Sequence, residues 1–257
     1  MNIGLIGQGA IARYVSRGIE AQGHELSAVL VRAENVEKNP DLFVSKVQDL
    51  PDTIDVIIDC AGHEALAGYG PAILAGGTDM ISVSAGALAD QDLADRLEHA
   101  ARQGKSRLHL VCGAVGALDC LSAAANGALT SVTYVGRKPP SGWKGSPAED
   151  RLDLASISGP EEHFAGSARQ AALRYPKNAN VAAAVAMAGL GFDDTQVRLI
   201  ADPTIDQNIH EVEAEGDFGT FSFRICGNAL PDNPRSSALT AMSVLAKIDQ
   251  LTKPIVL

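Results

Sequence analysis

The sequence predicts an α/β protein: an N-terminal Rossmann (doubly wound parallel sheet) domain followed by a second, α+β domain. Residues 1–112 alternate apolar strand segments with helical segments, which is typical of a doubly wound parallel sheet. Residues 113–236 change to small-residue helices and alternating strands. The last helical segment, 237–251, has an apolar face that we expect to pack back on the first domain.

The first dozen residues are the most informative segment. Apolar residues 3–6 predict a strand, Gly7 and Gly9 predict a tight turn, and a helical pattern runs over 10–22. This order of strand, glycine turn and helix is the context of a dinucleotide-binding fingerprint, with Ala12 in place of its third glycine.

Each residue type in this turn has a physical reason. Gly7 permits the turn, and Gly9 lets a pyrophosphate approach the backbone. The helix start at Ala10 and Ile11 offers unpaired N–H groups and a partial positive charge to phosphates. The alternative is an ordinary glycine-rich turn that binds nothing.

The end of the second strand bears on the choice of dinucleotide. Residues 26–31 form an apolar run, and Arg32 follows where an NAD-specific fold has an acid that binds the ribose 2′-OH. The nearest acid is Glu34. Because a cation there can contact a 2′-phosphate or stack on adenine, the cofactor is predicted as NAD or NADP. A solvated surface arginine is the alternative.

The next strand also ends in small residues. Residues 55–59 are a continuous apolar strand bounded by acids, and Ala61 and Gly62 follow, so a cofactor can lie over the strand end. His63 is expected at the rim, as a helix-start residue. The first domain is completed by a helix to residue 75, strands 80–83 and 108–111, and a helix over 89–103.

The second domain begins with a glycine- and alanine-rich turn over 112–119, which contains Ala114. We expect this turn beside the nicotinamide half of a cofactor, where the domains meet. The remaining predicted elements are helix 120–127, a strand from 131 to 135, loop 138–143, helix 161–173, turn 175–180, helix 181–190 with Asn180 as N-cap, strands 197–202, 208–215 and 218–226, and loop 231–236.

Composition limits the function classes. The net charge of −10 argues against general nucleic-acid binding and against anionic membranes, and the apolar runs are too short to span a bilayer. The N-terminal segment lacks the basic region of a signal peptide. The four scattered cysteines are predicted to be buried small residues in a reducing compartment, so we expect a cytoplasmic protein without a metal site.

His210 is the candidate for proton chemistry. A lone strand histidine is usually structural, but a nicotinamide oxidoreductase needs a group that handles a proton near the carbon that gives up hydride.

Four segments, in order along nearly the whole chain, resemble bacterial L-aspartate dehydrogenases. They are residues 4–11, 113–119, 175–183 and 208–211. The most specific is Pro-Lys-Asn-x-Asn-Val-Ala-Ala, within the third segment.

This resemblance implies an enzyme that uses NAD or NADP to convert L-aspartate to iminosuccinate, which hydrolyses to oxaloacetate and ammonia. It implies that Ala114 and Asn180 contact the cofactor and that His210 is the catalytic histidine. It also implies a homodimer built through the sheet of the second domain. The direction stays open, since iminosuccinate can feed pyridine nucleotide biosynthesis, or the reaction can degrade aspartate.

In the mechanism we expect, His210 takes the proton of the substrate amine or orients the substrate. Lys138, Arg169 and Lys177 are the candidate ligands of the two substrate carboxylates. Two alternatives remain: another Rossmann oxidoreductase, of the sugar or dihydrodipicolinate type, and a non-catalytic NAD(P)-binding sensor.

Overall fold

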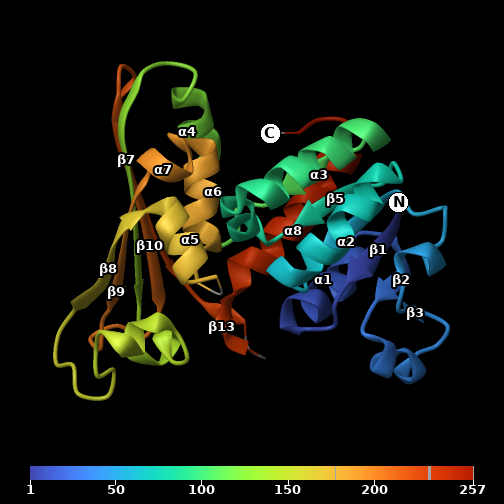
Figure 1. Cartoon of the computed structure of the whole chain (residues 1–257), viewed down its shortest axis with the longest axis horizontal. Helices are drawn as coiled ribbons and strands as arrows, with labels where there is room; N and C mark the ends of the chain where they lie inside the picture. The colour runs from blue at the N-terminus through green and yellow to red at the C-terminus, as the bar shows by residue number, and fades with distance from the viewer. Residues whose placement is uncertain (177, 231–232, 257) are drawn as a thin grey trace. The chain divides into compact units, whose positions relative to one another are not determined.

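The computed structural model describes residues 1–176, 178–230 and 233–256, and the chain divides into two compact units (Figure 1). Unit 1 comprises Met1–Val111 and Thr240–Leu257, and unit 2 comprises Cys112–Leu239. Among the described residues, no helix is long and apolar enough to cross a membrane.

Unit 1 contains a six-stranded sheet in the order β3-β2-β1-β4-β5-β6, with every pair parallel. The strands are β1 Asn2–Ile6, β2 Glu25–Leu30, β3 Phe43–Val44, β4 Val56–Asp59, β5 Asp79–Ser82 and β6 Leu108–Leu110. The predicted doubly wound fold class is confirmed. The two-residue strand β3 was not predicted, because it is too short to show a period.

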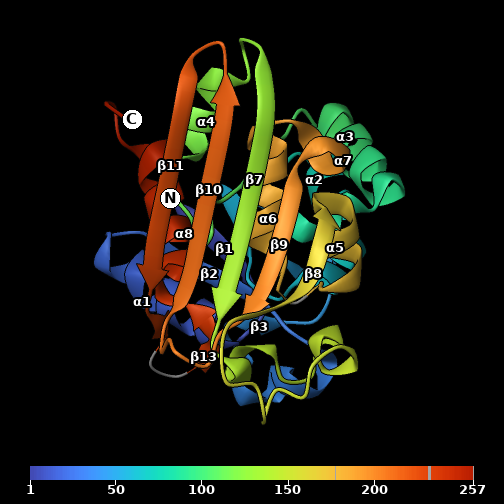
Figure 2. The ribbon, with the colours of Figure 1, turned by 90° about the vertical axis from the view of Figure 1, so that its left-hand side faces the viewer.

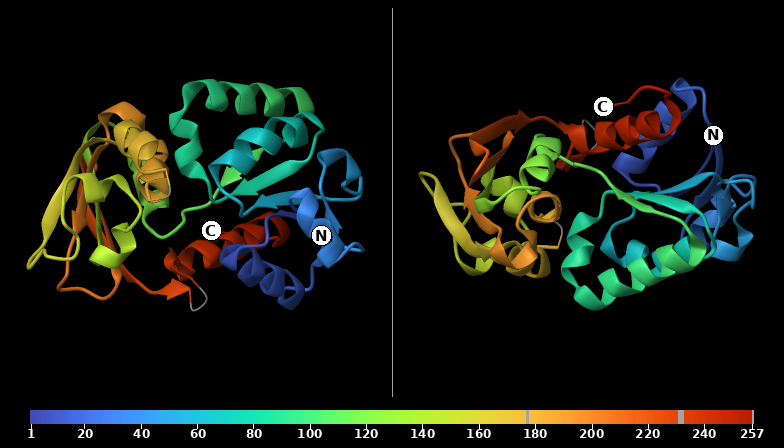
Figure 3. Two further views of the ribbon diagram at one scale, coloured as in Figure 1. Left: turned by 60° about the horizontal axis from the view of Figure 1, so that its bottom comes forward. Right: turned by 90° about the horizontal axis from the view of Figure 1, so that it is seen from above.

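Helices cover both faces of this sheet (Figure 3): α1 and α8 lie on one face, and α2 and α3 on the other. Their bounds are α1 Ala10–Ala21, α2 His63–Ala75, α3 Gln91–Gly104 and α8 Ala238–Thr252. Gly18 lies where any side chain would collide with Leu245, so glycine is what lets α8 pack closely on α1. Because both faces are covered, the central strands β1, β4 and β5 are almost continuously buried, with Ile3, Leu5 and Ile6 at most 1% exposed.

A buried carboxylate lies at the carboxyl end of β4. Asp59 is 0% exposed, and its oxygens accept hydrogen bonds from the Ser82 hydroxyl at 2.7 Å, the Ser84 hydroxyl at 2.8 Å and the Ala61 N–H at 2.9 Å. Burial raises the pKa of the Asp59 carboxyl, and these hydrogen bonds counteract that rise. Asp59 therefore fixes the ends of β4 and β5 and the turn that follows β4.

Unit 2 contains a five-stranded mixed sheet in the order β11-β10-β7-β9-β8 (Figure 2). Only β7 and β9 pair in parallel. The strands are β7 Leu129–Lys138, β8 Glu161–Ser167, β9 Gln196–Ala201, β10 Asn208–Gly216 and β11 Gly219–Gly227. Helices α4 Leu118–Ala124, α5 Ala168–Arg174, α6 Asn180–Ala188 and α7 Gly191–Asp194 lie on one face of the sheet. A small sheet pairs β12 Ala229–Leu230 with β13 Asn233–Ser237.

Short 3₁₀ helices occupy several of the connections in the two units. They are η1 Ala33–Lys38, η2 Val47–Asp49, η3 Ala85–Ala89, η4 Pro140–Trp143 and η5 Pro147–Asp150.

The predicted helix over 161–173 is wrong in its first half, which is strand β8. The helix begins only at Ala168, because Ser167 forms a capping box with Gln170: the serine side chain accepts the Gln170 N–H, and the glutamine side chain accepts the Ser167 N–H. The predicted loop over 231–236 is also wrong from Asn233 onward, where β13 pairs with β12; its first two residues lie outside the described residues.

The prediction that all four cysteines are buried is wrong. Cys120 and Cys226 are exposed, while Cys60 and Cys112 are half-buried. Cys226 lies on β11 in the alternation that exposes Arg224, so strand register sets its exposure.

We predict that Asp59→Ala lowers the free energy of unfolding by about 2–4 kcal/mol, because it leaves buried hydroxyls and an N–H without their acceptor. Urea denaturation followed by circular dichroism measures this loss. The control is Asp55→Ala just before β4, where an exposed carboxylate accepts the Asn2 N–H at 2.7 Å. That loss should stay below about 1 kcal/mol; equal losses for the two variants would contradict the role given to Asp59.

Candidate active site

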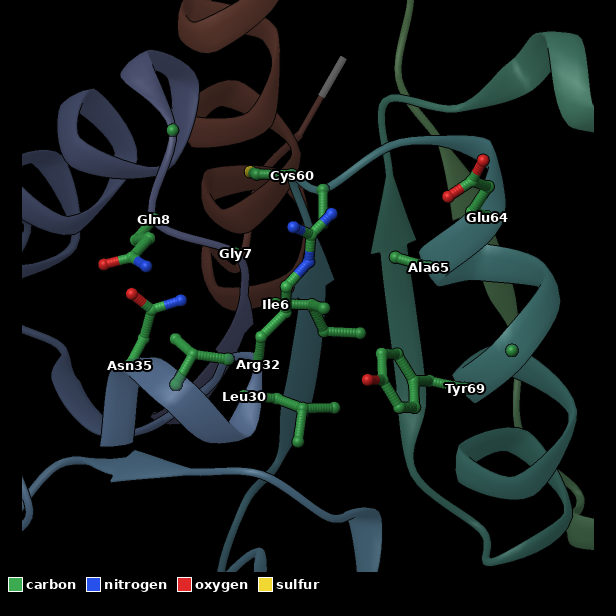
Figure 4. Close-up of a pocket in the computed structure, with 14 residues that line it drawn as sticks. Ile6, Gly7, Gln8, Leu30, Arg32, Asn35, Cys60, Glu64, Ala65 and Tyr69 are labelled. Carbon is green, nitrogen blue, oxygen red and sulfur yellow. The ribbon is translucent and has the colours of Figure 1, made fainter. Parts of the chain in front are cut away.

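Unit 1 has a cavity of about 610 Å³ at the carboxyl ends of β1, β2 and β4 (Figure 4). This is where the strand order reverses, the usual ligand position in a doubly wound sheet. Its lining comes from the glycine turn, the end of β2 with η1, the end of β4, and one face of α2. The lining residues are Ile6, Gly7, Gln8, Gly9, Leu30, Val31, Arg32, Asn35, Cys60, Ala61, Glu64, Ala65, Gly68 and Tyr69.

Gly7 and Gly9 of the turn differ in why a larger residue would not fit the proposed role. Gly7 has φ of +98°, and a Cβ there would lie 3.0 Å from the Cβ of Ala61. Gly9 has an ordinary backbone conformation, with φ of −71°, and a Cβ there would meet no atom within 4 Å. The space beside Gly9 is therefore an open cradle that a side chain would fill and that a pyrophosphate fits.

The start of α1 is prepared for an anion. Gly9 is its N-cap, no side chain caps the helix, and its first turn carries no acid. The N–H groups of Ala10 and Ile11 have no partner within the helix and lie at its positive end. The Arg13 guanidinium donates to the Gln8 carbonyl at 3.0 Å, which fixes the turn before the helix.

Arg32 extends across the cavity between Asn35 and Tyr69 (Figure 4). It takes part in none of the ion pairs between described residues. Sequence reasoning missed Asn35, Glu64 and Tyr69 as lining residues. Glu64 and Tyr69 could have been predicted from the sequence, because residues 64, 65, 68 and 69 share one face of α2.

The structure thus brings four predicted cofactor residues, Gly7, Gly9, Arg32 and Ala61, to one cavity. Gly62 is the N-cap of α2, with φ of +101°. His63 is the first residue of that helix, as expected.

Ala10, Ile11 and Gly62 belong to unit 1 but do not line this cavity, and the last two predicted cofactor residues belong to unit 2. Ala114 is buried in the loop before α4. Asn180 is the first residue of α6, whose N-cap is Ala179, so its prediction as the N-cap is wrong. The Ala179 carbonyl already accepts the Ala183 N–H, which places the cap one residue earlier.

His210 is 3% exposed and lies on β10, directly opposite Gly136 of β7. Its Nδ1 lies 2.7 Å from the hydroxyl oxygen of Tyr134. Burial, with a smaller effect of the Lys138 charge, lowers the pKa of His210 to about 3. The imidazole is therefore neutral at physiological pH.

Lys138 ends β7 rather than lying in a loop, because β7 is longer than predicted. Its side chain is on the same face of the strand as Tyr134, and the residue is 8% exposed. The ammonium donates to the Asn178 side-chain oxygen at 2.9 Å and lies 5.0 Å from the centre of the Trp143 ring. Burial lowers the pKa of Lys138 to about 8. No described carboxylate pairs with it, so the arrangement favours an anionic ligand.

The other two predicted carboxylate ligands differ from Lys138. Arg169 makes a two-pronged ion pair with Asp193, at 2.7 and 2.8 Å, and the hydrogen bond to that carboxylate raises the pKa of Arg169. Lys177 lies outside the described residues.

Comparison with known proteins gives two family matches, which together span most of the chain. The model described as "Aspartate dehydrogenase, C-terminal" matches residues 119–251, and the one described as "Homoserine dehydrogenase, NAD binding domain" matches residues 4–111.

Individual relatives agree with these matches. The chain is 52% identical to the L-aspartate dehydrogenase of Ruegeria pomeroyi over 254 residues, covering 97% of this chain and 92% of that protein. It is 42% identical to that of Ralstonia pickettii, covering 95% of each. The crystal structure of aspartate dehydrogenase from Thermotoga maritima superposes with a TM-score of 0.80 at 26% identity, covering 100% of this chain and 99% of that one.

We predict that Gly9→Ala leaves the melting temperature unchanged but weakens NADH binding by about tenfold or more, because the new methyl group occupies the pyrophosphate space. Titration calorimetry measures the affinity. The matched variant Gly7→Ala should instead destabilise the fold by about 1–3 kcal/mol, since its φ is positive and the methyl group meets Ala61. Unchanged NADH affinity in Gly9→Ala would show that the pyrophosphate does not bind in the space beside Gly9.

Proposed function

This chain belongs to the aspartate dehydrogenase family, and from that premise we propose that His210 and Lys138 act directly on its substrate. The chain oxidises L-aspartate with NAD or NADP to iminosuccinate, which water converts to oxaloacetate and ammonia. The observation that carries the residue assignment is the pairing, on one face of a sheet, of a buried neutral imidazole with a buried ammonium that no described carboxylate neutralises.

The residues of the unit 1 cavity suit a dinucleotide. The open cradle beside Gly9 and the N–H groups of Ala10 and Ile11 would hold the pyrophosphate. When bound, the nicotinamide accepts the hydride that leaves the Cα of aspartate. Arg32 would face the adenosine ribose and its 2′ substituent, so we propose that it allows use of NADP beside NAD. The Michaelis constants of wild type and Arg32→Ala for NAD⁺ and NADP⁺ test this assignment.

We assign the anchoring of one substrate carboxylate to Lys138. The Lys138 ammonium is buried and has one amide oxygen as its partner. Low-polarity surroundings strengthen the attraction between opposite charges, so this ammonium binds an anion more strongly than an exposed one would. Arg169 is a weaker candidate because Asp193 already occupies its guanidinium.

We place His210 at the substrate, where it takes the proton of the amine or orients the substrate. Its Nδ1 is occupied by Tyr134, and Nε2 has no hydrogen-bond partner among the described residues. Nε2 is therefore the ring atom available to a ligand.

The cofactor contacts of unit 2 rest on the family resemblance alone. We propose that Ala114 and Asn180 make them; NADH affinity in Asn180→Ala tests the second contact.

We further propose a cytoplasmic homodimer built through the open face of the unit 2 sheet, which no described helix covers (Figure 2). Light scattering tests the dimer against the monomer mass of 26.7 kDa. Iminosuccinate, as the direct product, suits a supply of pyridine nucleotide precursors.

We predict that His210→Ala lowers turnover with L-aspartate by about 10²–10⁴-fold while NADH affinity stays nearly intact. Initial rates of NAD(P)H formation at alkaline pH, with L-glutamate and L-malate as competing substrates, provide the measurement. His99→Ala is the control, since it removes an exposed histidine of α3. Unchanged turnover in His210→Ala would remove His210 from the mechanism; no turnover by the wild type would point to the sensor alternative.

The pKa of Lys138 gives a second prediction, for succinate, a dicarboxylate without the amine. Below pH 8 Lys138 is a cation, and above pH 8 it loses its charge. The inhibition constant of succinate should therefore rise by up to about tenfold per pH unit above pH 8.

Lys138→Met should lack this rise and bind succinate about 10- to 100-fold more weakly at pH 7. Lys144→Met, which removes a nearby exposed lysine, is the control. Arg169→Ala in the same assay tests the other described candidate. A pH-independent inhibition constant in the wild type would rule out Lys138 as the carboxylate ligand.

A further inference from the structure

We propose that Tyr134 is a positioning residue that holds His210 as the tautomer with its proton on Nε2. In this form His210 donates a hydrogen bond to the substrate and does not accept the proton of the substrate amine. The inference rests on the placement of His210 at the substrate, and it decides between the two roles left open above.

The sheet register brings the two side chains together. On β7 and β10, Tyr134 is opposite Val212 and Gly136 is opposite His210, so the tyrosine must reach diagonally across Gly136. A Cβ on Gly136 would lie 2.7 Å from the Tyr134 hydroxyl oxygen. Glycine at this position therefore leaves the space through which the hydroxyl reaches the imidazole.

The Tyr134 hydroxyl lies within hydrogen-bond distance of the His210 imidazole. The hydroxyl oxygen is 2.7 Å from Nδ1, while the ring centres are 6.0 Å apart and the ring planes differ by 16°. A hydroxyl at this distance forms a hydrogen bond with Nδ1, which takes part through either its lone pair or its proton.

Burial decides which of the two groups donates. Tyr134 is 1% exposed, and Nδ1 of His210 is the one hydrogen-bond partner of its hydroxyl in the described part of the chain. If Nδ1 carried the proton, the phenol O–H would be left buried without an acceptor, which is unfavourable. Burial also raises the pKa of Tyr134, so the phenol keeps its proton. The hydroxyl therefore donates to Nδ1, and the proton of the neutral ring lies on Nε2.

This tautomer limits what His210 can do. A protonated Nε2 has no lone pair for the proton of an ammonium group, but it can donate a hydrogen bond to a carboxylate oxygen. Lys138 lies on the same face, so the sheet offers an N–H donor and a cation to a substrate that carries two carboxylates. The amine proton then leaves to solvent before hydride transfer.

The test is nitrogen NMR of the imidazole rings, which separates protonated from unprotonated ring nitrogens and needs no turnover. The chain has six histidines, and His210→Gln identifies the signals of this one. In the wild type we expect a protonated Nε2 and an unprotonated Nδ1. A protonated Nδ1 in the wild type would overturn the proposal, whatever the variants do.

Tyr134→Phe keeps the ring and removes the hydroxyl. We expect His210 to populate both tautomers and kcat to fall by about 10- to 100-fold, the size found when the orienting partner of a metal-bound histidine is removed. The Michaelis constant for the cofactor should stay unchanged. If His210 keeps its single tautomer in Tyr134→Phe, Tyr134 is not its positioning residue.

Tyr175→Phe is the matched control, because it removes the other buried tyrosine–histidine hydrogen bond of unit 2, in which the Tyr175 hydroxyl lies 3.2 Å from Nδ1 of His163. Tyr175→Phe should leave the chemical shifts of His210 unchanged. The fall in its melting temperature measures the loss of stability caused by removing one such hydrogen bond. Failure of the wild type to oxidise L-aspartate would instead count against the proposed function, and the NMR result would stand apart from it.

Discussion

The carboxylate of Asp59 is the constraint on which the cofactor side of this molecule depends. Hydrogen bonds from Ser82 and Ser84 hold it at the ends of β4 and β5, and the hydrogen bond from the Ala61 N–H fixes the turn after β4. Ala61 in turn lies against Gly7 so closely that a Cβ there would be 3.0 Å from its own. The shape of the glycine turn therefore follows from a buried carboxylate that is not part of the cavity lining, which is how the supporting residues of a site set its precision.

The buried ionisable groups of the two units differ in how many hydrogen-bond partners they have. Asp59 in unit 1 has enough donors to be satisfied by the protein itself. Lys138 in unit 2 has a single amide oxygen and an aromatic face, which leave most of its charge uncompensated. Hydrogen bonds make a buried charge tolerable in a fold, whereas a buried charge with few partners favours the binding of an ion of opposite charge. The first arrangement belongs to the architecture of unit 1, and the second is the basis of the carboxylate-binding role that we propose for Lys138.

Local patterns were sufficient to predict the glycine turn, α1 and the cavity residues Gly7, Gly9 and Arg32, because these are close in sequence. The contacts of the two residues that we propose act on the substrate are not local. Tyr134 and His210 are 76 residues apart, and Lys138 and Asn178 are 40 apart, so only strand register and packing bring each pair together. The error over 161–173 has the same origin: Ser167 decides where the helix begins, and pairing with β9 makes the preceding residues a strand.

Unit 1 is built from both ends of the chain, and this has a consequence for synthesis on the ribosome. The N-terminal strands and α1 emerge first, yet Gly18 meets its partner Leu245 only after all of unit 2 has been translated. Unit 2 is continuous in sequence, so it can complete its core while α1 still exposes the face that α8 will cover. This connectivity therefore allows the reverse of the usual order, in which the first domain made is the first to fold.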